Sequence, residues 1–242
     1  MGYKTSMLEH TNSDLWSAYG HTFYAPAIDE NSIALDLGSS SALFAHEVAE
    51  EKGCQFHVVE ALPEIFERIE ETSLVKKHHF AICGEDKPQT FSVVNDEERW
   101  GLLRSDGKAG PGETVEVPGT TLKNFIEHIG AELVDLAKVD IEGAEIAMFG
   151  ATDDDTLKSI KQISIEFHDF MDPRLNDPVQ HILARMDNLG FQTFIFTRRF
   201  HGDVLFINPD HIKLPALKSF SFRYLTKYFR GIKRIAARGS LT

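Results

Sequence analysis

The feature that most constrains the fold of this chain is the regular alternation of short apolar runs with helical patterns. Five apolar runs of strand length occupy residues 32–38, 55–61, 78–84, 133–141 and 163–168. The segments between them carry apolar residues at helical spacing, for example in "SSALFAHEVAEEKG" and "LPEIFERIEE". Strands that alternate with helices in this way form a parallel sheet with helices packed on its faces. The sequence therefore predicts an α/β fold with five parallel strands.

Two further strands close the predicted sheet. The segments "FQTFIFTRR" and "DVLFIN" are separated by only a few residues, so they must run antiparallel to each other. A second pair of short stretches, "QTFSVVND" and "ETVEVPG", interrupts the alternation after the third strand and predicts an inserted hairpin. The expected architecture is five parallel strands plus a closing antiparallel pair, with one inserted hairpin.

Charge is distributed unevenly along the chain. Residues 211–242 carry eight Lys or Arg and no Asp or Glu, although the whole chain has a formal net charge of -12. The rest of the chain is therefore strongly acidic and would repel DNA or RNA, which argues against a nucleic-acid partner for the main domain. We divide the chain into an N-terminal arm over residues 1–30, a main domain over 31–210 and a basic C-terminal helix over 211–242.

The basic C-terminal segment has an apolar stripe at helical spacing, opposite its Lys and Arg residues. The stripe consists of Leu217, Phe220, Tyr224, Tyr228, Ile232 and Ile235. A basic amphipathic helix is typical of a peripheral contact with a membrane surface or with a partner protein. The alternative is a terminal helix that packs on its own acidic domain.

The compartment is inferred from what the sequence lacks. No apolar run approaches the roughly 18 residues of a membrane span, and the start "MGYKTSMLEH" has no apolar core of a secretory signal. Two cysteines, Cys54 and Cys83, are too few for a disulfide scaffold and suit a reducing compartment. We expect a cytoplasmic protein, peripheral at the membrane if the C-terminal helix docks there.

A cofactor signal lies at the ends of the first two strands. Ligands of a doubly wound sheet bind beyond the carboxyl ends of its strands, and "DLGSSSA" follows the first of them. Gly38 allows close approach of backbone to a ligand, while Ser39 and Ser40 offer N–H groups and hydroxyls. Glu60 ends the second strand, where a carboxylate can accept both hydroxyls of a ribose. A nicotinamide enzyme would favour G-x-G-x-x-G, whereas a single glycine suits a ligand without pyrophosphate, such as S-adenosylmethionine.

Three blocks of the sequence resemble one known family. They are "ALDLGSSSALFAHEVAEEKGCQFHVVEALPEIFERI", "TTLKNFIEHIGAELVDLAKVDIEGAEIAMFGA" and "ISIEFH", and the resemblance extends from Ile33 to Phe170. The blocks look like the FkbM-type methyltransferases, S-adenosylmethionine-dependent enzymes with the class I, Rossmann-like fold. The family signature matches Lys138, Asp140, Glu142, Gly143 and Glu145.

The chain departs from this family at three positions. The family usually has Asn and Gly where this chain has Ser40 and Ala42, and Pro where it has Ala61. The resemblance implies that Asp140 faces the methyl-donor pocket. The predicted donor site consists of Asp36, Gly38, Ser39, Ser40, Glu60, Ala61, Ile82 and Asp140.

Ionisable residues gather where the predicted fourth and fifth strands end. Side chains alternate along a strand, so Lys138 and Asp140 project to one side and Glu166 and His168 share a face of the next strand. We predict these four residues as the catalytic group. Asp140, Glu166 and His168 would be the ligands of a divalent cation if one is bound. The alternative is a base that deprotonates an acceptor hydroxyl.

Three features lie next to this group. Glu142 is placed to extend the row formed by Lys138 and Asp140, and Glu145 lies in the first turn of a helix, where the macrodipole favours an acid with or without a catalytic role. The N-terminal arm, with His10 and His21, could cover the pocket.

The resemblance implies an O-methyltransferase that acts on a hydroxyl of a sugar, a glycan or a small metabolite. Two classes of protein remain as alternatives. One is a nicotinamide-dependent oxidoreductase, disfavoured by the single glycine of the first turn. The other is a non-catalytic adaptor for a membrane or a complex, built on a methyltransferase fold.

Overall fold

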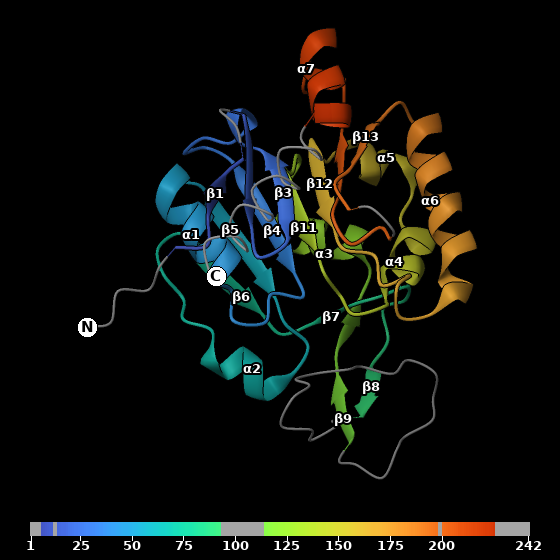
Figure 1. Ribbon diagram of the computed structural model, residues 1–242. Helices are drawn as coiled ribbons and strands as arrows, with labels where there is room; N and C mark the ends of the chain where they lie inside the picture. Colours follow the sequence, from blue (N-terminus) through green and yellow to red (C-terminus); the bar gives the residue numbers. More distant parts are fainter. Residues whose placement is uncertain (1–5, 12–13, 93–113, 198–199, 226–242) are drawn as a thin grey trace, which may run out of the picture.

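The protein is described here from a computed structural model, which defines residues 6–11, 14–92, 114–197 and 200–225. Its centre is a sheet of seven strands in the order β13-β14-β12-β11-β4-β5-β6 (Figure 1). The strands are β4 (Ile33–Leu37), β5 (Gln55–Val59), β6 (Val75–His78), β11 (Leu136–Val139), β12 (Gln162–Ile165), β13 (Gln192–Ile195) and β14 (Val204–Ile207). Strands β4, β5, β6, β11 and β12 pair in parallel, and β14 is antiparallel to both β12 and β13. The predicted fold class, five parallel strands plus a closing antiparallel pair, is confirmed.

Helices cover both faces of this sheet (Figure 1). They are α1 (Leu43–Lys52), α2 (Pro63–Arg68), α3 (Leu122–His128), α4 (Glu145–Ala151), α5 (Asp154–Lys158) and α6 (Asn176–Asn188). Alternation along the strands separates two cores: Leu35 and Val139 pack with α3, α4 and α6, whereas Ala34 and Leu136 pack with α1. Thr121 caps α3, because its side chain accepts a hydrogen bond from the N–H of Asn124.

The third strand of the sheet differs from the prediction. We expected it at residues 78–84, but β6 runs from Val75 to His78. The following β7 (Ala81–Ile82) instead pairs with β10 (Gly119–Thr120) in a separate two-stranded ladder. Strand β6 lies at the edge of the sheet and carries Lys76 and Lys77, charged residues of the kind that protect an edge from pairing with other chains. Those lysines hid the strand from a search for apolar runs.

The inserted hairpin is confirmed in its described part. Strand β8 (Gln89–Ser92) pairs antiparallel with β9 (Thr114–Val117), and this ladder projects from the sheet below the ends of β4 and β5 in Figure 1. The loop around Trp100 that joins the two strands lies outside the described residues.

The N-terminal segment contributes strands that sequence analysis did not expect. Strands β1 (Glu9–His10), β2 (Leu15–Ala18) and β3 (His21–Tyr24) form a small antiparallel sheet. Leu15 and Phe23 are fully buried. The backbone N–H and hydroxyl of Thr22 donate to the Asp203 carboxylate, and the N–H of Tyr24 donates to the Gln162 side chain. Strand β3 therefore packs beside β12 and β14 of the main sheet.

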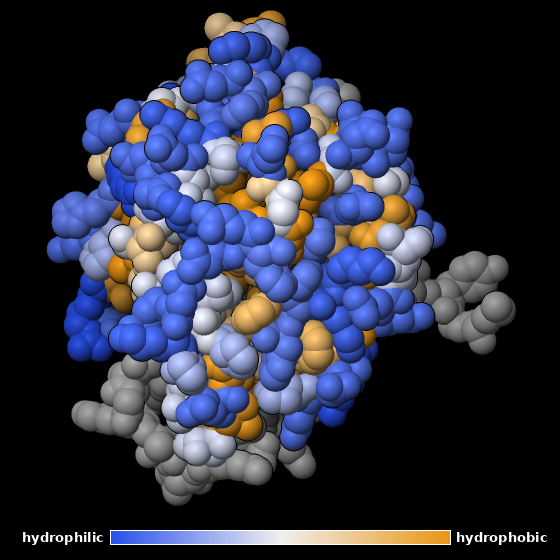
Figure 2. Space-filling view, turned by 180° about the vertical axis from the view of Figure 1, so that it is seen from behind, coloured by the Kyte–Doolittle hydropathy of each residue, from blue (hydrophilic) through white to orange (hydrophobic). Residues whose placement is uncertain are grey.

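The C-terminal segment begins with α7 (Ala216–Phe220), followed by one wide helical turn over Ser221–Leu225. Of the predicted apolar stripe, Leu217, Phe220 and Tyr224 are exposed. Apolar atoms accordingly appear at the top of the space-filling view, where α7 lies (Figure 2). Phe222, outside the predicted stripe, is buried against Phe194. The stripe residues Tyr228, Ile232 and Ile235 lie outside the described residues. Among the helices that the structure describes, none is long and apolar enough to span a bilayer.

Candidate functional site

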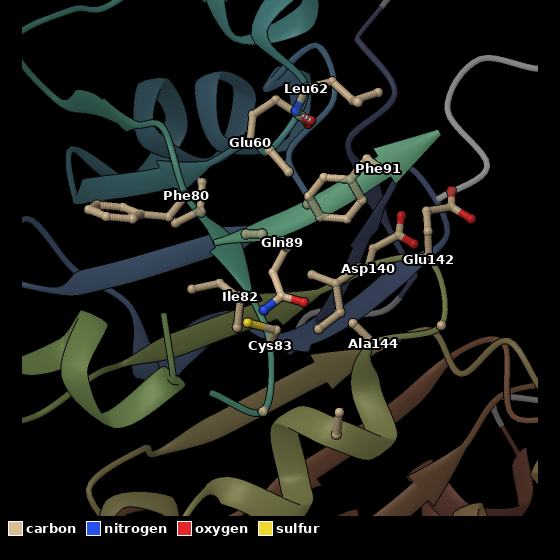
Figure 3. A pocket seen from close by; sticks show the side chains of 18 of the residues that line it. Glu60, Leu62, Phe80, Ile82, Cys83, Gln89, Phe91, Asp140, Glu142 and Ala144 are labelled. Carbon is tan, nitrogen blue, oxygen red and sulfur yellow. Dashed lines mark hydrogen bonds between the residues drawn. The ribbon is translucent and has the colours of Figure 1, made fainter. Parts of the chain in front are cut away.

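A cavity of about 440 Å³ opens at the carboxyl ends of β4, β5 and β11. Glu60, Asp140 and Phe91 face it from β5, β11 and the inserted hairpin (Figure 3). The other predicted donor-site residues that line it are Gly38, Ser40, Ala61 and Ile82. Asp36 and Ser39 are buried but do not line the cavity. The position is the one where ligands of open α/β sheets bind.

The turn after β4 fits only glycine at its first position. Gly38 has a φ of 73°, and a Cβ there would lie 1.8 Å from the carbonyl oxygen of Asp140. Two residues that follow it, Ser40 and Ala42, also adopt the left-handed conformation, with φ values of 50° and 54°. Asn and Gly tolerate this left-handed conformation better than Ser and Ala. Two of the three positions at which the chain departs from the family pattern, Ser40 and Ala42, are therefore positions where the backbone favours Asn or Gly.

Glu60 connects this turn to the end of β5. Its Oε2 accepts a hydrogen bond from the N–H of Ser40 at 2.9 Å, and its Oε1 accepts one from the N–H of Leu62 at 2.8 Å. Burial raises the pKa of Glu60, although both N–H groups act in the opposite direction. Each carboxylate oxygen retains a lone pair directed to other donors. The side chain can thus bind hydroxyl groups of a ligand without giving up its backbone contacts.

Lys138 is a buried cation beneath the turn. Its Nζ lies 3.1 Å from Oδ1 of Asp36 and donates to the carbonyl oxygen of Gly38 at 2.7 Å. Burial alone would lower the pKa of Lys138, but Asp36 and Asp140 outweigh it and raise that pKa. Lys138 does not line the cavity. It therefore holds the turn after β4 in place.

Asp140 lies between three cationic or titratable side chains. Its Oδ2 is 3.7 Å from Lys138 Nζ and 3.7 Å from His21 Nε2, and its Oδ1 is 3.7 Å from His168 Nε2. Burial alone would raise the pKa of Asp140, but His21, Lys138 and His168 lower it to about 2. Asp140 is therefore an anion at the wall of the cavity.

His168 is held by carboxylates on both ring nitrogens. Nδ1 lies 3.0 Å from Oε1 of Glu145, and Nε2 lies 3.3 Å from Oε2 of Glu142. Burial alone would lower the pKa of His168, but Glu145, Glu142 and Asp140 raise it to about 9. An imidazolium with this pKa does not take up a proton at neutral pH. Glu145 is almost completely buried and orients the His168 ring, so its role is not limited to stabilising the start of α4.

Glu166 directly follows β12 and lies close to Asp140 and His21. Burial, and after it the charge of Asp140, raise the pKa of Glu166 to about 7. The predicted cation ligands Asp140, Glu166 and His168 do not form one group. Asp140 instead belongs to two, with Glu142 and His168 in one and with His21 and Glu166 in the other.

His21 is the member of this site that sequence analysis did not assign. It lies at the start of β3, after a two-residue connection in which Tyr19 and Gly20 have φ values of 49° and 86°. Two residues with positive φ between antiparallel strands are typical of a type I′ hairpin. The dipeptide Tyr-Gly between "LWSA" and "HTFY" was the signal for this hairpin.

Comparison with known proteins identifies one family. The family model described as "Methyltransferase FkbM domain" matches residues 30–193. No match was found among the curated proteins.

Three solved structures of methyltransferases are similar to this chain. The structure of methyltransferase FkbM from Methylobacillus flagellatus KT is 15% identical with a TM-score of 0.47, and the match covers 74% of this chain and 44% of that one. Precorrin-6y C5,15-methyltransferase from Geobacter metallireducens GS-15 is 10% identical with a TM-score of 0.40, over 76% of this chain and 82% of that one. A SAM-dependent methyltransferase from Geobacter sulfurreducens, in complex with S-adenosyl-L-homocysteine, is 11% identical with a TM-score of 0.38, over 89% and 73%. The chain thus spans less than half the length of the first of these proteins.

Proposed function

The chain belongs to the FkbM family of methyltransferases, and on this premise we propose that it transfers the methyl group of S-adenosylmethionine to a hydroxyl of a sugar, a glycan or a small metabolite. The observation that carries the proposal is the joint position of Gly38 and Glu60 at one cavity. Glu60 binds the ribose hydroxyls, and the turn at Gly38 and Ser40 binds the methionine part of the donor.

The remaining walls of the cavity suit the adenine base. Ala61, Ile82 and Phe80 supply apolar surface to the cavity, and Phe80 lies at the end away from Asp140 (Figure 3). A cavity of about 440 Å³ lies in the size range of small-molecule and cofactor sites. Asp140 marks the end at which the methyl group would leave, and the side chains behind it would face the acceptor.

Methyl transfer requires a positioned acceptor with an activated oxygen. His168 is held as an imidazolium and so serves in our proposal as a fixed positive charge that orients Glu142 and Asp140, not as a base. Activation falls to Glu166 as a proton acceptor, or to Asp140 and Glu166 together as ligands of a divalent cation. Chelator treatment separates the two, because only the second depends on a cation.

Incubation with methyl-labelled S-adenosylmethionine and a panel of glycans and hydroxylated metabolites tests the activity. We expect label in at least one hydroxyl-bearing acceptor, and its loss in Asp140→Asn. Absence of transfer to every acceptor, together with absence of donor binding, would favour the adaptor class. Binding of NAD in place of S-adenosylmethionine would favour the oxidoreductase.

A second proposal concerns the C-terminal helix, which we infer contacts an anionic membrane surface. Three apolar side chains, Leu217, Phe220 and Tyr224, are exposed on consecutive turns. One basic residue is already engaged within the domain, since Lys218 Nζ lies 2.6 Å from Asp14 Oδ2. Exposed apolar residues on a helix from a basic segment favour an interface between water and lipid.

A further inference from the structure

His21 is a buried histidine without a hydrogen-bond partner among the described residues. Its side chain has no measurable exposure, and neither ring nitrogen is bonded in the part of the chain that the structure describes. One face of its environment is apolar, where the ring meets Phe44 edge to face at 6.0 Å between centroids. An unpaired polar group in a buried position costs about 1–3 kcal/mol. Such a cost calls for a ligand that the ring binds.

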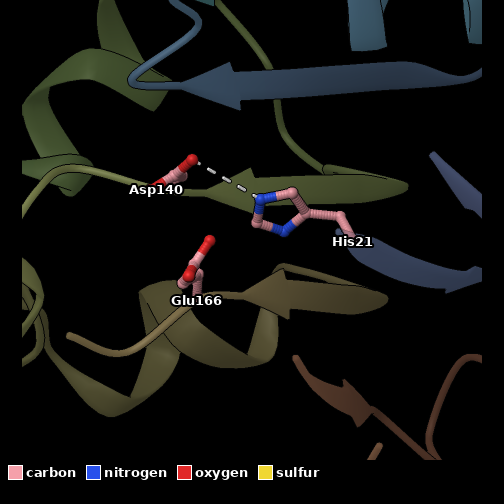
Figure 4. Close-up of side chains that lie close together, drawn as sticks. All are labelled: His21, Asp140 and Glu166. Atoms are coloured by element: carbon pink, nitrogen blue, oxygen red, sulfur yellow. Dashed lines mark ion pairs between the residues drawn. The ribbon is translucent and has the colours of Figure 1, made fainter. Parts of the chain in front are cut away.

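One ring nitrogen of His21 faces the carboxylate of Asp140 (Figure 4). Nε2 lies 3.7 Å from Oδ2 of Asp140, which is too long for a hydrogen bond. A nitrogen of His21 and carboxylate oxygens of Asp140 and Glu166 all lie within 4.8 Å of one another. Figure 4 shows the three side chains converging from β3 and from the ends of β11 and β12. Ligands of one cation at about 2.0–2.2 Å are separated by distances of this size.

The cations next to this group are held more closely by other carboxylates. Lys138 lies closer to Asp36, at 3.1 Å, than to Asp140, at 3.7 Å. His168 is engaged by Glu145 and Glu142 on its two nitrogens. Both cations approach Asp140 only to 3.7 Å, and two carboxylates at close range repel each other. A divalent cation between them would remove this repulsion.

We propose that His21, Asp140 and Glu166 hold a divalent cation such as Mn²⁺ on the side of Asp140 away from the donor cavity. One imidazole and two carboxylates are ligands suited to first-row divalent metals. His21 takes the place that sequence analysis gave to His168, whose nitrogens are already paired. Of the three residues only Asp140 lines the donor cavity. The proposal rests on the proposed function in one respect: the acceptor hydroxyl would bind at the coordination positions that the three side chains leave open.

The competing arrangement is the group of Asp140, Glu142 and His168. It is less favourable because the His168 imidazole already has a carboxylate at each nitrogen, so a cation would have to displace His168 from Glu142. Glu142 is also exposed to water over 41% of its side chain. The two groups share Asp140 and differ in their other members, which makes them separable by mutation.

Binding of Mn²⁺ to the full-length protein, followed by electron paramagnetic resonance, tests the assignment. We expect one Mn²⁺ per chain in the wild type. In His21→Phe and in Glu166→Gln the affinity should fall by more than about 100-fold, because removing a ligand costs more than removing a residue that only supports a ligand. Glu142→Gln is the matched control and should bind Mn²⁺ as the wild type does. Phe at position 21 keeps an aromatic ring against Phe44, and thermal melting shows whether each variant is folded.

Any other pattern overturns the proposal. Absence of Mn²⁺ binding in the wild type, wild-type affinity in folded His21→Phe, or loss in Glu142→Gln would each exclude this group as the cation site. Titration of the same proteins with S-adenosylhomocysteine keeps this outcome distinct from a failure of the proposed function. If the donor product binds and Mn²⁺ does not, only the cation site is wrong; if neither binds, both are.

Discussion

Lys138 and Asp36 lie side by side on β11 and β4, with Nζ 3.1 Å from Oδ1 and both side chains buried. Removal of the cation leaves a buried anion without compensation. We expect Lys138→Met to reduce the free energy of unfolding by about 3–5 kcal/mol in urea titrations, and the double variant Asp36→Val/Lys138→Met to recover most of that loss. Lys123→Met, which breaks the exposed pair with Asp153, is the control and should not change the midpoint. A Lys138→Met protein as stable as the wild type would show that the pair is not structural.

The left-handed turn after β4 predicts a stabilising substitution. Ser40 is exposed and has a φ of 50°, a conformation that Asn adopts more readily. Ser40→Asn should raise the free energy of unfolding by about 0.5–1 kcal/mol and leave the backbone contact to Glu60 intact. Its neighbour Ser41 is also exposed but has no positive φ, so Ser41→Asn should give no gain. Equal effects at both positions would show that the backbone conformation is not the cause.

A pair of histidines outside the site makes stability depend on pH. His78 Nε2 lies 2.9 Å from His57 Nδ1, and burial, followed by the charges of His57 and His128, lowers the pKa of His78 from 6.5 to about 4. The unfolded chain therefore binds more protons than the folded chain between these values. Stability should be complete above pH 6.5 and fall as the pH drops toward 4, by at most about 1.4 kcal/mol per pH unit and less because His78 is only half-buried.

Urea titrations across this range check the effect. The loss between pH 6.5 and 4 should be smaller in His78→Gln than in the wild type, and unchanged in His181→Gln, which replaces an exposed histidine. Parallel curves for the wild type and His78→Gln would remove His78 as the source.

The membrane proposal for the C-terminal helix is tested by sedimentation with anionic vesicles. Each basic residue near such a surface contributes on the order of 1 kcal/mol, and the attraction weakens with salt. The full-length protein should pellet with these vesicles at low salt, and the Leu217→Asp/Phe220→Asp variant should pellet less. Met7→Asp changes an apolar residue elsewhere that is about as exposed as Phe220, and it should have no effect. Equal, negligible pelleting of all three proteins would exclude the lipid contact.

The order of the strands could be predicted because alternation along the chain and the short final connection are local properties of the sequence. Strand β6 was misplaced since its edge position, which explains Lys76 and Lys77, follows only from the complete sheet. A cavity at the ends of β4 and β5 could be expected from Gly38 and Glu60, which end neighbouring strands, and its role as the methyl-donor site stays a prediction. Asp36 and Ser39, by contrast, are buried and do not line the cavity, and Asp36 is paired there with Lys138.

The acceptor side could be predicted only in part. Asp140, Glu166 and His168 end adjacent strands, and so their proximity follows from a parallel sheet. The approach of His21 to Asp140 joins residues far apart in sequence through the packing of β3 beside β12, and no local pattern encodes that packing. The pairing of Glu145 with His168 likewise depends on where α4 settles against the end of β12.

The most direct test of the account is calorimetric titration of the wild-type protein and of Glu60→Gln with S-adenosylmethionine. The substitution keeps the shape of the side chain and removes its charge, so we expect one site in the wild type and a 10- to 100-fold weaker site in the variant, corresponding to about 1.5–3 kcal/mol for hydrogen bonds to a charged group. Glu64→Gln, in the exposed first turn of α2, should bind as the wild type does. Absence of donor binding in the wild type, or unchanged affinity in Glu60→Gln, would contradict the assignment of this cavity as the methyl-donor site.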